Sequence, residues 1–281
     1  TNPQGHHRMA YWDWGDAGNP RVLICVHGLS RQGRDFDTLA QAMSDRYRVI
    51  CPDVVGRGRS DWLQDPMGYQ VPQYMADMVT LMTSLGTPTV DWLGTSMGGL
   101  IGIGLAAMPH APISRMVIND VGPRIEPAAI ARIGSYMGRP VRWATVDNAA
   151  DALWEISKSF GPHTRAQWRA LTEPQLKQDA SDGQGGYILR ADPGIAVPFK
   201  AAAPQAAAAG EAMLWQAWDH IKAPTLLVRG ADSDLLSRET ALAMTQSGPQ
   251  ARLVEFAGVG HAPTLVQPEQ VEAVRAFLLA P

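Results

Sequence analysis

The sequence has little of several features that mark special classes of protein. Only two cysteines, Cys25 and Cys51, occur in 281 residues, which excludes a disulfide-stapled fold and makes a thiolate metal site unexpected. No apolar run approaches the roughly 20 residues of a membrane-spanning helix, so no membrane partner is expected. The opening residues TNPQGHHRMA lack the apolar stretch of a secretory signal, and a cytoplasmic location is the expectation.

The sequence also lacks a large excess of positive or negative charge. The 24 Lys and Arg residues are scattered and balanced by 27 Asp and Glu, giving a net charge of −3, so no nucleic-acid partner is expected. The glycine-rich stretches GRGRS (56–60) and GTSMGG (94–99) lack the GK[ST] ending of a phosphate loop. The adjacent side chains of His6 and His7 diverge in an extended chain, which makes a poor metal site. We therefore expect neither a cofactor nor a metal.

What the sequence does have is 46% hydrophobic residues, gathered in short runs. The runs are RVLICVHG (21–28), YRVICPD (47–53), TVDWLG (89–94), RMVIND (115–120), TLLVRG (225–230) and RLVEFAG (252–258). They are continuously apolar, which is typical of strands covered on both faces. Helix-length segments lie between them, so we predict an α/β fold with a mostly parallel sheet. The segment MAYWDWGD (9–16) alternates more and predicts an antiparallel edge hairpin.

The interval between the runs 115–120 and 225–230 is too long for a loop inside a compact domain. We predict a mainly helical cap over residues 123–218, inserted between the sixth and seventh strands of a core that comprises residues 1–122 and 219–281. Five of the nine tryptophans fall in this cap, and we expect most of them to pack in its interior. The Ala-rich stretch KAAAPQAAAAGEA (200–212) is compatible with either a helix or a connector.

One serine stands out in the stretch TVDWLGTSMGGL (89–100). Ser96 lies between Gly94 and Gly98, after a predicted strand and at the start of a predicted helix, which is the G-x-S-x-G pattern in its required context. Such a turn strains the backbone of the serine and tolerates little bulk two residues before and after it. The hydroxyl then projects from the carboxyl end of the sheet, where the N–H of Met97 can stabilise an oxyanion.

These residues, together with four other stretches in the expected order, resemble the α/β-hydrolase family. The stretches are HGLS (27–30), DVVGRGRS (53–60), RGADSDLLS (229–237) and GVGHAP (258–263). The resemblance implies a sheet of about eight strands with an inserted cap. It also implies that the backbone N–H of Leu29 is the second oxyanion donor, beside that of Met97, and that His27 shapes this loop.

The resemblance further implies a catalytic triad in the chain order serine, acid, histidine. A serine hydroxyl needs a base, and the base needs an acceptor on its other nitrogen. His261 is the expected base, because it follows a predicted strand among small and turn-forming residues. The acid is more open, because Ser233 stands at the family's usual position. We prefer Asp234, since the stretch DLLS (234–237) resembles the family's acid followed by two apolar residues and a turn residue. Asp232 and Asp120 are the alternatives, the last because some members carry the acid after the preceding strand.

The function expected from this pattern is that of a serine hydrolase, carboxylesterase-like, that cleaves a carboxylic ester of a small molecule through an acyl-enzyme. A lactonase or a C–C bond hydrolase can use the same triad, and a non-catalytic ligand-binding receptor can keep the same fold. The expected partner is a small-molecule ester or lactone. Arg31 and Arg34 follow the oxyanion loop and can either meet a substrate carboxylate or be solvated charges. The sequence gives no indication of the oligomeric state.

Overall fold

A computed structural model describes residues 2, 4–181, 183, 185–201 and 204–281 of the chain. Within them, seven strands form one sheet in the order β1-β3-β2-β4-β5-β8-β9. The strands are β1 (Tyr11–Trp14), β2 (Val22–Val26), β3 (Arg48–Pro52), β4 (Val90–Thr95), β5 (Ile113–Asn119), β8 (Thr225–Gly230) and β9 (Arg252–Phe256). Strand β1 pairs antiparallel with β3, and the other pairs are parallel.

The six predicted apolar runs all form strands of this parallel sheet, as expected for continuously apolar segments. The seven strands found in the part of the chain described agree with the expected sheet of about eight. The predicted edge hairpin at residues 9–16 is a single antiparallel strand, β1, because its partner is β3 and not an adjacent segment.

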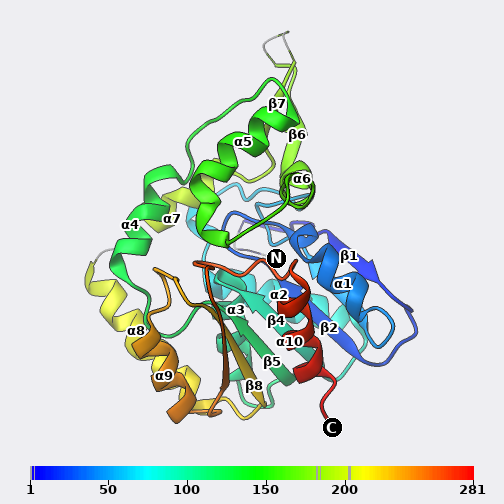
Figure 1. Ribbon diagram of the computed structural model, residues 1–281, viewed down its shortest axis with the longest axis vertical. Coiled ribbons are helices and arrows are strands. Elements are labelled where there is room, and N and C mark those ends of the chain that lie inside the picture. The colour runs from blue at the N-terminus through cyan, green and yellow to red at the C-terminus, as the bar shows by residue number, and fades with distance from the viewer. Residues whose placement is uncertain (1, 3, 182, 184, 202–203) are drawn as a thin grey trace.

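Helices cover both faces of the sheet (Figure 1). The helices of the core are α1 (Asp37–Met43), α2 (Val71–Leu85), α3 (Met97–Ala106), α9 (Arg238–Gln246) and α10 (Pro268–Leu278). Alternate residues of each strand point to opposite faces. Thus Leu23 and Cys25 of β2 pack with α1 and α10, whereas Ile24 packs with α2, α3 and α9. Two hydrophobic cores result, one on each side of the sheet.

The long interval lies between β5 and β8, which are the fifth and sixth strands of the main sheet in chain order, so its predicted place between the sixth and seventh strands is wrong. Its elements are α4 (Pro127–Tyr136), α5 (Val146–Ser157), α6 (Arg165–Thr172), β6 (Leu176–Gln178), β7 (Tyr187–Leu189), α7 (Ala196–Ala201) and α8 (Pro204–His220). Five short 3-10 helices complete the described structure: η1 (Gly33–Phe36), η2 (Pro66–Gly68), η3 (Lys158–Phe160), η4 (Glu173–Gln175) and η5 (Pro193–Ile195).

In Figure 1 the elements α4 to α7, β6 and β7 lie above the sheet, whereas α8 runs down beside it. Leu214, Trp215 and Trp218 of α8 pack against the same core as α3, although the predicted division assigns them to the cap. The division into core and cap itself stays a prediction. The Ala-rich stretch is helical from Pro204 onwards, and its residues 202 and 203 lie outside the described residues, as do residues 182 and 184 of the Gly-rich stretch.

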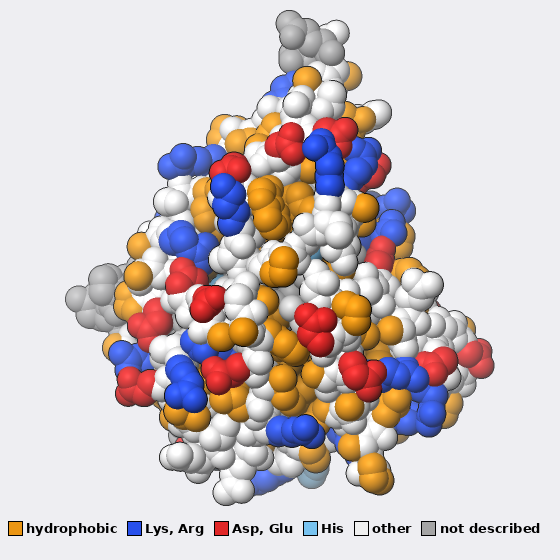
Figure 2. All heavy atoms as spheres, viewed as in Figure 1, with side chains coloured by type: hydrophobic (Ala, Val, Ile, Leu, Met, Phe, Trp, Pro, Cys, Tyr) orange, Lys and Arg blue, Asp and Glu red, His pale blue; other side chains and the backbone are white. Residues whose placement is uncertain are grey.

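Two features of the surface are plain. On the face shown in Figure 2, acidic and basic side chains are intermixed rather than separated into fields of one sign. None of the described helices combines the length and apolar character that a bilayer crossing requires.

Candidate active site

Ser96 occupies a strained turn between β4 and α3. Its backbone has φ 53° and ψ −115°, and α3 begins at the next residue. A Cβ at Gly94 would contact the carbonyl oxygen of Gly98, and one at Gly98 would contact that of Val26. The two glycines are therefore required by close backbone approach, as the G-x-S-x-G pattern predicts. A residue held in this sparsely populated region points to a functional site.

Three side chains form a hydrogen-bonded chain at this turn. Nε2 of His261 lies 3.0 Å from the Ser96 hydroxyl oxygen, and Nδ1 of His261 lies 2.8 Å from Oδ2 of Asp120. A carboxylate only accepts, so Nδ1 carries the imidazole proton and Nε2 is left to accept from Ser96. Asp120 is fully buried and His261 nearly so. The arrangement is that of a nucleophile, a base and an acceptor that fixes the base.

The preferred acid, Asp234, does not contact His261. Its carboxylate instead accepts two hydrogen bonds from Arg132 of α4, at 2.7 and 2.9 Å, and its side chain is 44% exposed. Asp232 is exposed as well, and its backbone N–H bonds to the carbonyl oxygen of Val259. The expectation that Asp234 contacts His261 is therefore wrong. The alternative Asp120 accepts the hydrogen bond of His261 instead. It can do so because it follows β5, which is the neighbour of β8 in the sheet.

The Asp120 carboxylate accepts hydrogen bonds from two groups besides His261. The backbone N–H of Gly230 donates to its Oδ1 at 2.9 Å, and the hydroxyl of Ser233 donates to its Oδ2 at 2.7 Å. Ser233 in turn accepts from the backbone N–H groups of Leu235 and Leu236. Sequence reasoning named Ser233 only as the residue at the usual acid position. The absence of a carboxylate at that position is the signal in the sequence that points to a carboxylate from another strand, and the Ser233 hydroxyl contacts one from β5.

The loop after β2 lies directly against Ser96. A Cβ at Gly28 would stand 3.6 Å from that of Ser96, which brings the following N–H of Leu29 to the same region. Met97 is the first residue of α3, so its N–H has no partner within the helix. No described residue accepts a hydrogen bond from the N–H of Leu29 or Met97. Both groups are thus available to an anion.

His27 fixes this loop and is not a base. Its ring accepts a hydrogen bond at Nε2 from the Val54 N–H at 3.0 Å, and its Nδ1 donates to the carbonyl oxygen of Gly28 at 2.7 Å. Burial lowers the pKa of His27 to about 3, so the ring is neutral. Nε of Arg57 donates to the carbonyl oxygen of Leu29 at 2.8 Å and ties down the other side of the loop.

A cavity of about 110 Å³ opens above Ser96 and His261. Its walls come from the loop at residues 28–31 and from α4, α5 and η3 above it. It adjoins a larger cavity of about 420 Å³ under α4, α5 and β7, and the two share the residues Ser30, Tyr136, Met137, Leu153, Ile156 and Gln175. Ser96 and His261 therefore face a space large enough for a small organic molecule.

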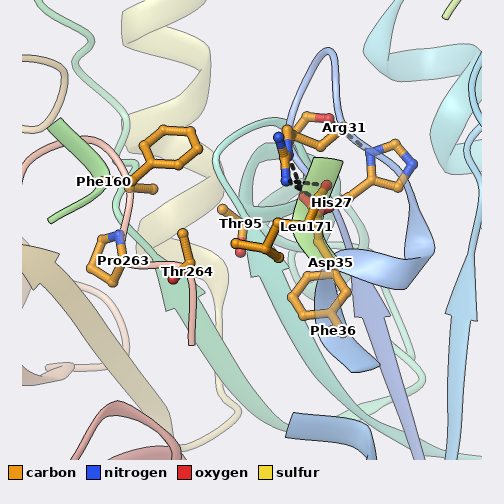
Figure 3. A pocket seen from close by; sticks show the side chains of 11 residues that line it. His27, Arg31, Asp35, Phe36, Thr95, Phe160, Leu171, Pro263 and Thr264 are labelled. Atoms are coloured by element: carbon orange, nitrogen blue, oxygen red, sulfur yellow. Dashed lines mark hydrogen bonds and ion pairs between the residues drawn. The ribbon is translucent and has the colours of Figure 1, made fainter. Parts of the chain in front are cut away.

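A smaller pocket adjoins the cavity above Ser96 and is lined by His27, Arg31, Asp35 and Phe36 among others (Figure 3). Arg31 lines both this pocket and the cavity above Ser96, and its guanidinium donates to both carboxylate oxygens of Asp35, at 2.5 and 2.8 Å. Burial raises the pKa of the Asp35 carboxyl, and the Arg31 charge opposes that rise. Arg34 instead pairs with Asp37 and lies over the ring of Trp12. Of the two arginines, only Arg31 faces the cavity.

The tryptophans of the interval mostly pack with one another or with the core. Trp154 and Trp168 meet edge to face with ring centroids 5.1 Å apart, and Trp218 is fully buried. Trp143 alone among the five lines the larger cavity in the part of the chain described. Within those residues there is also no group of three or more His, Cys, Asp or Glu side chains placed to hold a metal ion.

Comparison with known proteins gives one consistent family. The model of the alpha/beta hydrolase family matches residues 23–274. The 3-hydroxybutyrate-oligomer hydrolase of Cupriavidus necator is 53% identical over 98% of this chain and 94% of its own. The solved structure of an alpha/beta hydrolase from Novosphingobium aromaticivorans is 35% identical, covering 97% of this chain and 98% of its own, with a TM-score of 0.83. A putative hydrolase from Rickettsia typhi is 28% identical, covering 97% and 91%, with a TM-score of 0.87.

These similarities extend over almost the whole chain and concern hydrolases. A further relative, 25% identical over 91% of this chain and 93% of its own, is the pimeloyl-[acyl-carrier protein] methyl ester esterase of Vibrio cholerae. These similarities set aside the alternative of a non-catalytic receptor. The chain belongs to the alpha/beta hydrolase family, and it is a hydrolase that acts on ester or similar acyl bonds.

Proposed function

We propose that this protein is a serine esterase that uses Ser96, His261 and Asp120 and cleaves its substrate through an acyl-enzyme. The observation that carries the proposal is the hydrogen-bonded chain from the Ser96 hydroxyl through His261 to Asp120, with distances of 3.0 and 2.8 Å, at the floor of a cavity. It replaces the preferred acid Asp234 with Asp120.

In the first half of the reaction, the Ser96 oxygen attacks the ester carbonyl carbon while Nε2 of His261 takes the hydroxyl proton. Asp120 holds Nδ1–H and stabilises the imidazolium that forms. The N–H groups of Leu29 and Met97 stabilise the carbonyl oxygen as it becomes an oxyanion. His261 then gives its proton to the leaving alcohol, the C–O bond breaks, and the acyl group remains on Ser96.

In the second half, water attacks the acyl carbon and loses a proton to Nε2 of His261. The same two N–H groups stabilise the second oxyanion. The bond to the Ser96 oxygen breaks, that oxygen recovers a proton from His261, and the carboxylic acid leaves. Water and ester are the only reactants, so one water molecule is consumed for each ester bond that is cleaved.

We propose short oligomers of 3-hydroxybutyrate as the substrate, on the strength of the 53% identity to a hydrolase of such oligomers. The cavities support a substrate of this size and character, because the larger one is lined mainly by apolar side chains, which come largely from the segment 137–143, α5, β7 and residues 191–195. A 3-hydroxybutyrate dimer contains one ester bond and only short aliphatic segments, which suit such a lining.

The test combines a substrate-independent probe with a substrate panel. A fluorophosphonate should add once to the parent and not to a Ser96→Ala variant, as read by intact mass. The parent should then hydrolyse the 3-hydroxybutyrate dimer faster than a simple lactone or a vinylogous 1,5-diketone of similar size. An unlabelled parent with a folded spectrum would overturn the serine mechanism, and a preference for the lactone or the diketone would favour the lactonase or C–C hydrolase alternative.

A further inference from the structure

Arg132 brings a positive charge to the wall of the cavity above Ser96. It lies on α4 and lines the same cavity as Ser96 and His261, among apolar neighbours such as Ile133 and Ile156. A cation on the wall of a largely apolar cavity is costly unless an anion compensates it. Asp234, in the loop after β8, supplies that anion from outside the cavity.

The Arg132 and Asp234 pair is open to solvent. Their side chains are 36% and 44% exposed, so the attraction between them is screened and weak. Asp234 accepts from Nε and from one terminal nitrogen of Arg132. The Tyr136 hydroxyl, which lines the same cavity, also interacts with this guanidinium. A guanidinium has five N–H donors, so the contacts with Asp234 and Tyr136 still leave donors for a further acceptor.

Arg31 lines the same cavity but is committed elsewhere. Its pair with Asp35 is 14% and 16% exposed, and it also donates to the carbonyl oxygen of Leu171 at 3.3 Å. Separating a largely buried pair of this kind leaves a poorly solvated charge without its partner, which is unfavourable. Of the two arginines at the cavity, Arg132 is therefore the one that can bind a ligand anion at low cost.

We propose that Arg132 binds the free carboxylate of the substrate and so selects esters that end in a carboxylic acid over neutral esters. The inference rests on the proposed function and adds a specificity-determining residue to it. Asp234 competes with the substrate for the charge of the guanidinium and not for the same N–H groups, because its carboxylate already neutralises that charge in part from the other edge. In the proposed substrate, the carboxylate is the acid end of the 3-hydroxybutyrate chain.

The experiment measures binding without turnover. In a Ser96→Ala background, calorimetric titration gives the Kd of the 3-hydroxybutyrate dimer and of its primary amide, a neutral analogue of similar shape. We expect Arg132→Gln to raise the Kd of the acid about tenfold to a hundredfold, the effect of losing a charge-assisted hydrogen bond, and to leave the Kd of the amide nearly unchanged. Arg124→Gln is the matched control, since Arg124 precedes α4, is half exposed and is 3.9 Å from Glu126 outside the cavity.

Asp234→Asn tests the competition in the opposite direction. With the rival carboxylate removed, we expect the acid to bind several-fold more tightly and the amide to bind as before. Weaker binding of the acid in this variant would contradict the proposal that Asp234 opposes carboxylate binding at Arg132. Equal Kd values for acid and amide, an acid-to-amide ratio that Arg132→Gln does not change, or no binding of either compound would overturn the role of Arg132.

The proposed function is judged separately, by whether the parent hydrolyses the dimer at all. A parent that hydrolyses acid and amide dimers equally keeps its esterase function and loses the carboxylate site. A parent that is inactive on both dimers, while the Ser96→Ala variant still binds the acid through Arg132, keeps the site and loses the proposed substrate.

Discussion

The Ser233 hydroxyl lies 2.7 Å from Oδ2 of Asp120 and stands at the chain position where the family pattern most often has its acid. The two residues follow the adjacent parallel strands β8 and β5, so their side chains converge at one edge of the sheet. The carboxylate thus follows β5, and the hydroxyl that donates to it follows β8. The acceptor of His261 therefore lies next to the family's usual acid position in space, but it comes from the end of β5 and not from the end of β8.

The first prediction assigns the acid. Asp120→Asn should lower kcat for p-nitrophenyl butyrate by about three to four orders of magnitude, because an amide stabilises neither the correct tautomer nor the imidazolium. Asp234→Asn and Asp232→Asn should each cost less than about tenfold, since neither side chain contacts His261. A large loss of kcat in Asp234→Asn, with full activity in Asp120→Asn, would restore the assignment made from sequence.

The second prediction moves the acid back to β8. In the double variant Asp120→Asn and Ser233→Asp, the new carboxylate stands beside the position that Ser233 uses to reach Asp120. We expect it to recover at least about tenfold of the kcat lost in Asp120→Asn, because either strand end can supply an acceptor to His261. Ser233→Ala on the same background is the control and should recover nothing. A double variant no faster than Asp120→Asn would mean that the Ser233 position cannot reach the imidazole.

Ser96 and His261, whose side chains lie 3.0 Å apart, could be singled out from the sequence because the residues next to each of them mark a turn. The turn at Ser96 needs small residues at fixed offsets, so the glycines report the geometry directly. The acid could not be chosen in this way. Asp120 and Asp234 both follow strands of one parallel pair, and which carboxylate turns towards His261 depends on packing between loops far apart in the chain. The pairing of Asp234 with Arg132, 102 residues away, leaves no local signal for the same reason.

The fold, too, was predictable where it depends on local sequence and was not predictable where it depends on distant parts of the chain. Continuous apolar runs predicted each strand of the parallel sheet, because burial on both faces constrains every residue of a run. The inserted interval lies one strand earlier in the chain order than expected, because the segment at residues 9–16 forms one strand and not a hairpin of two. The packing of Trp218 against the core was missed because the chain returns to the sheet before the interval ends.

The third prediction concerns the backbone at the turn. Gly98→Ala would place a Cβ against the carbonyl oxygen of Val26 in β2, where neither backbone can yield without moving the sheet. We expect a loss of about 2 to 4 kcal/mol in the free energy of unfolding, measured by urea denaturation. Gly210→Ala in α8 is the control, because a Cβ there meets nothing within 4 Å and should stabilise the helix by up to about 1 kcal/mol. Equal stability of the two variants would contradict the close approach at Gly98.

The last prediction is a pH dependence of stability caused by His27. Burial lowers the pKa of this ring to about 3 in the folded protein, against about 6.5 in an unfolded chain. Between these values the unfolded chain binds a proton that the folded protein does not. The free energy of unfolding is therefore unaffected by His27 well above pH 6.5 and falls as the pH is lowered below it. His27 alone should remove about 1 kcal/mol between pH 7 and pH 5.5. Burial lowers the pKa of His163 too, which adds a loss of the same sign. NMR titration of the folded protein measures the ring directly, and a His27 midpoint near 6.5 would show that the oxyanion loop does not enclose it.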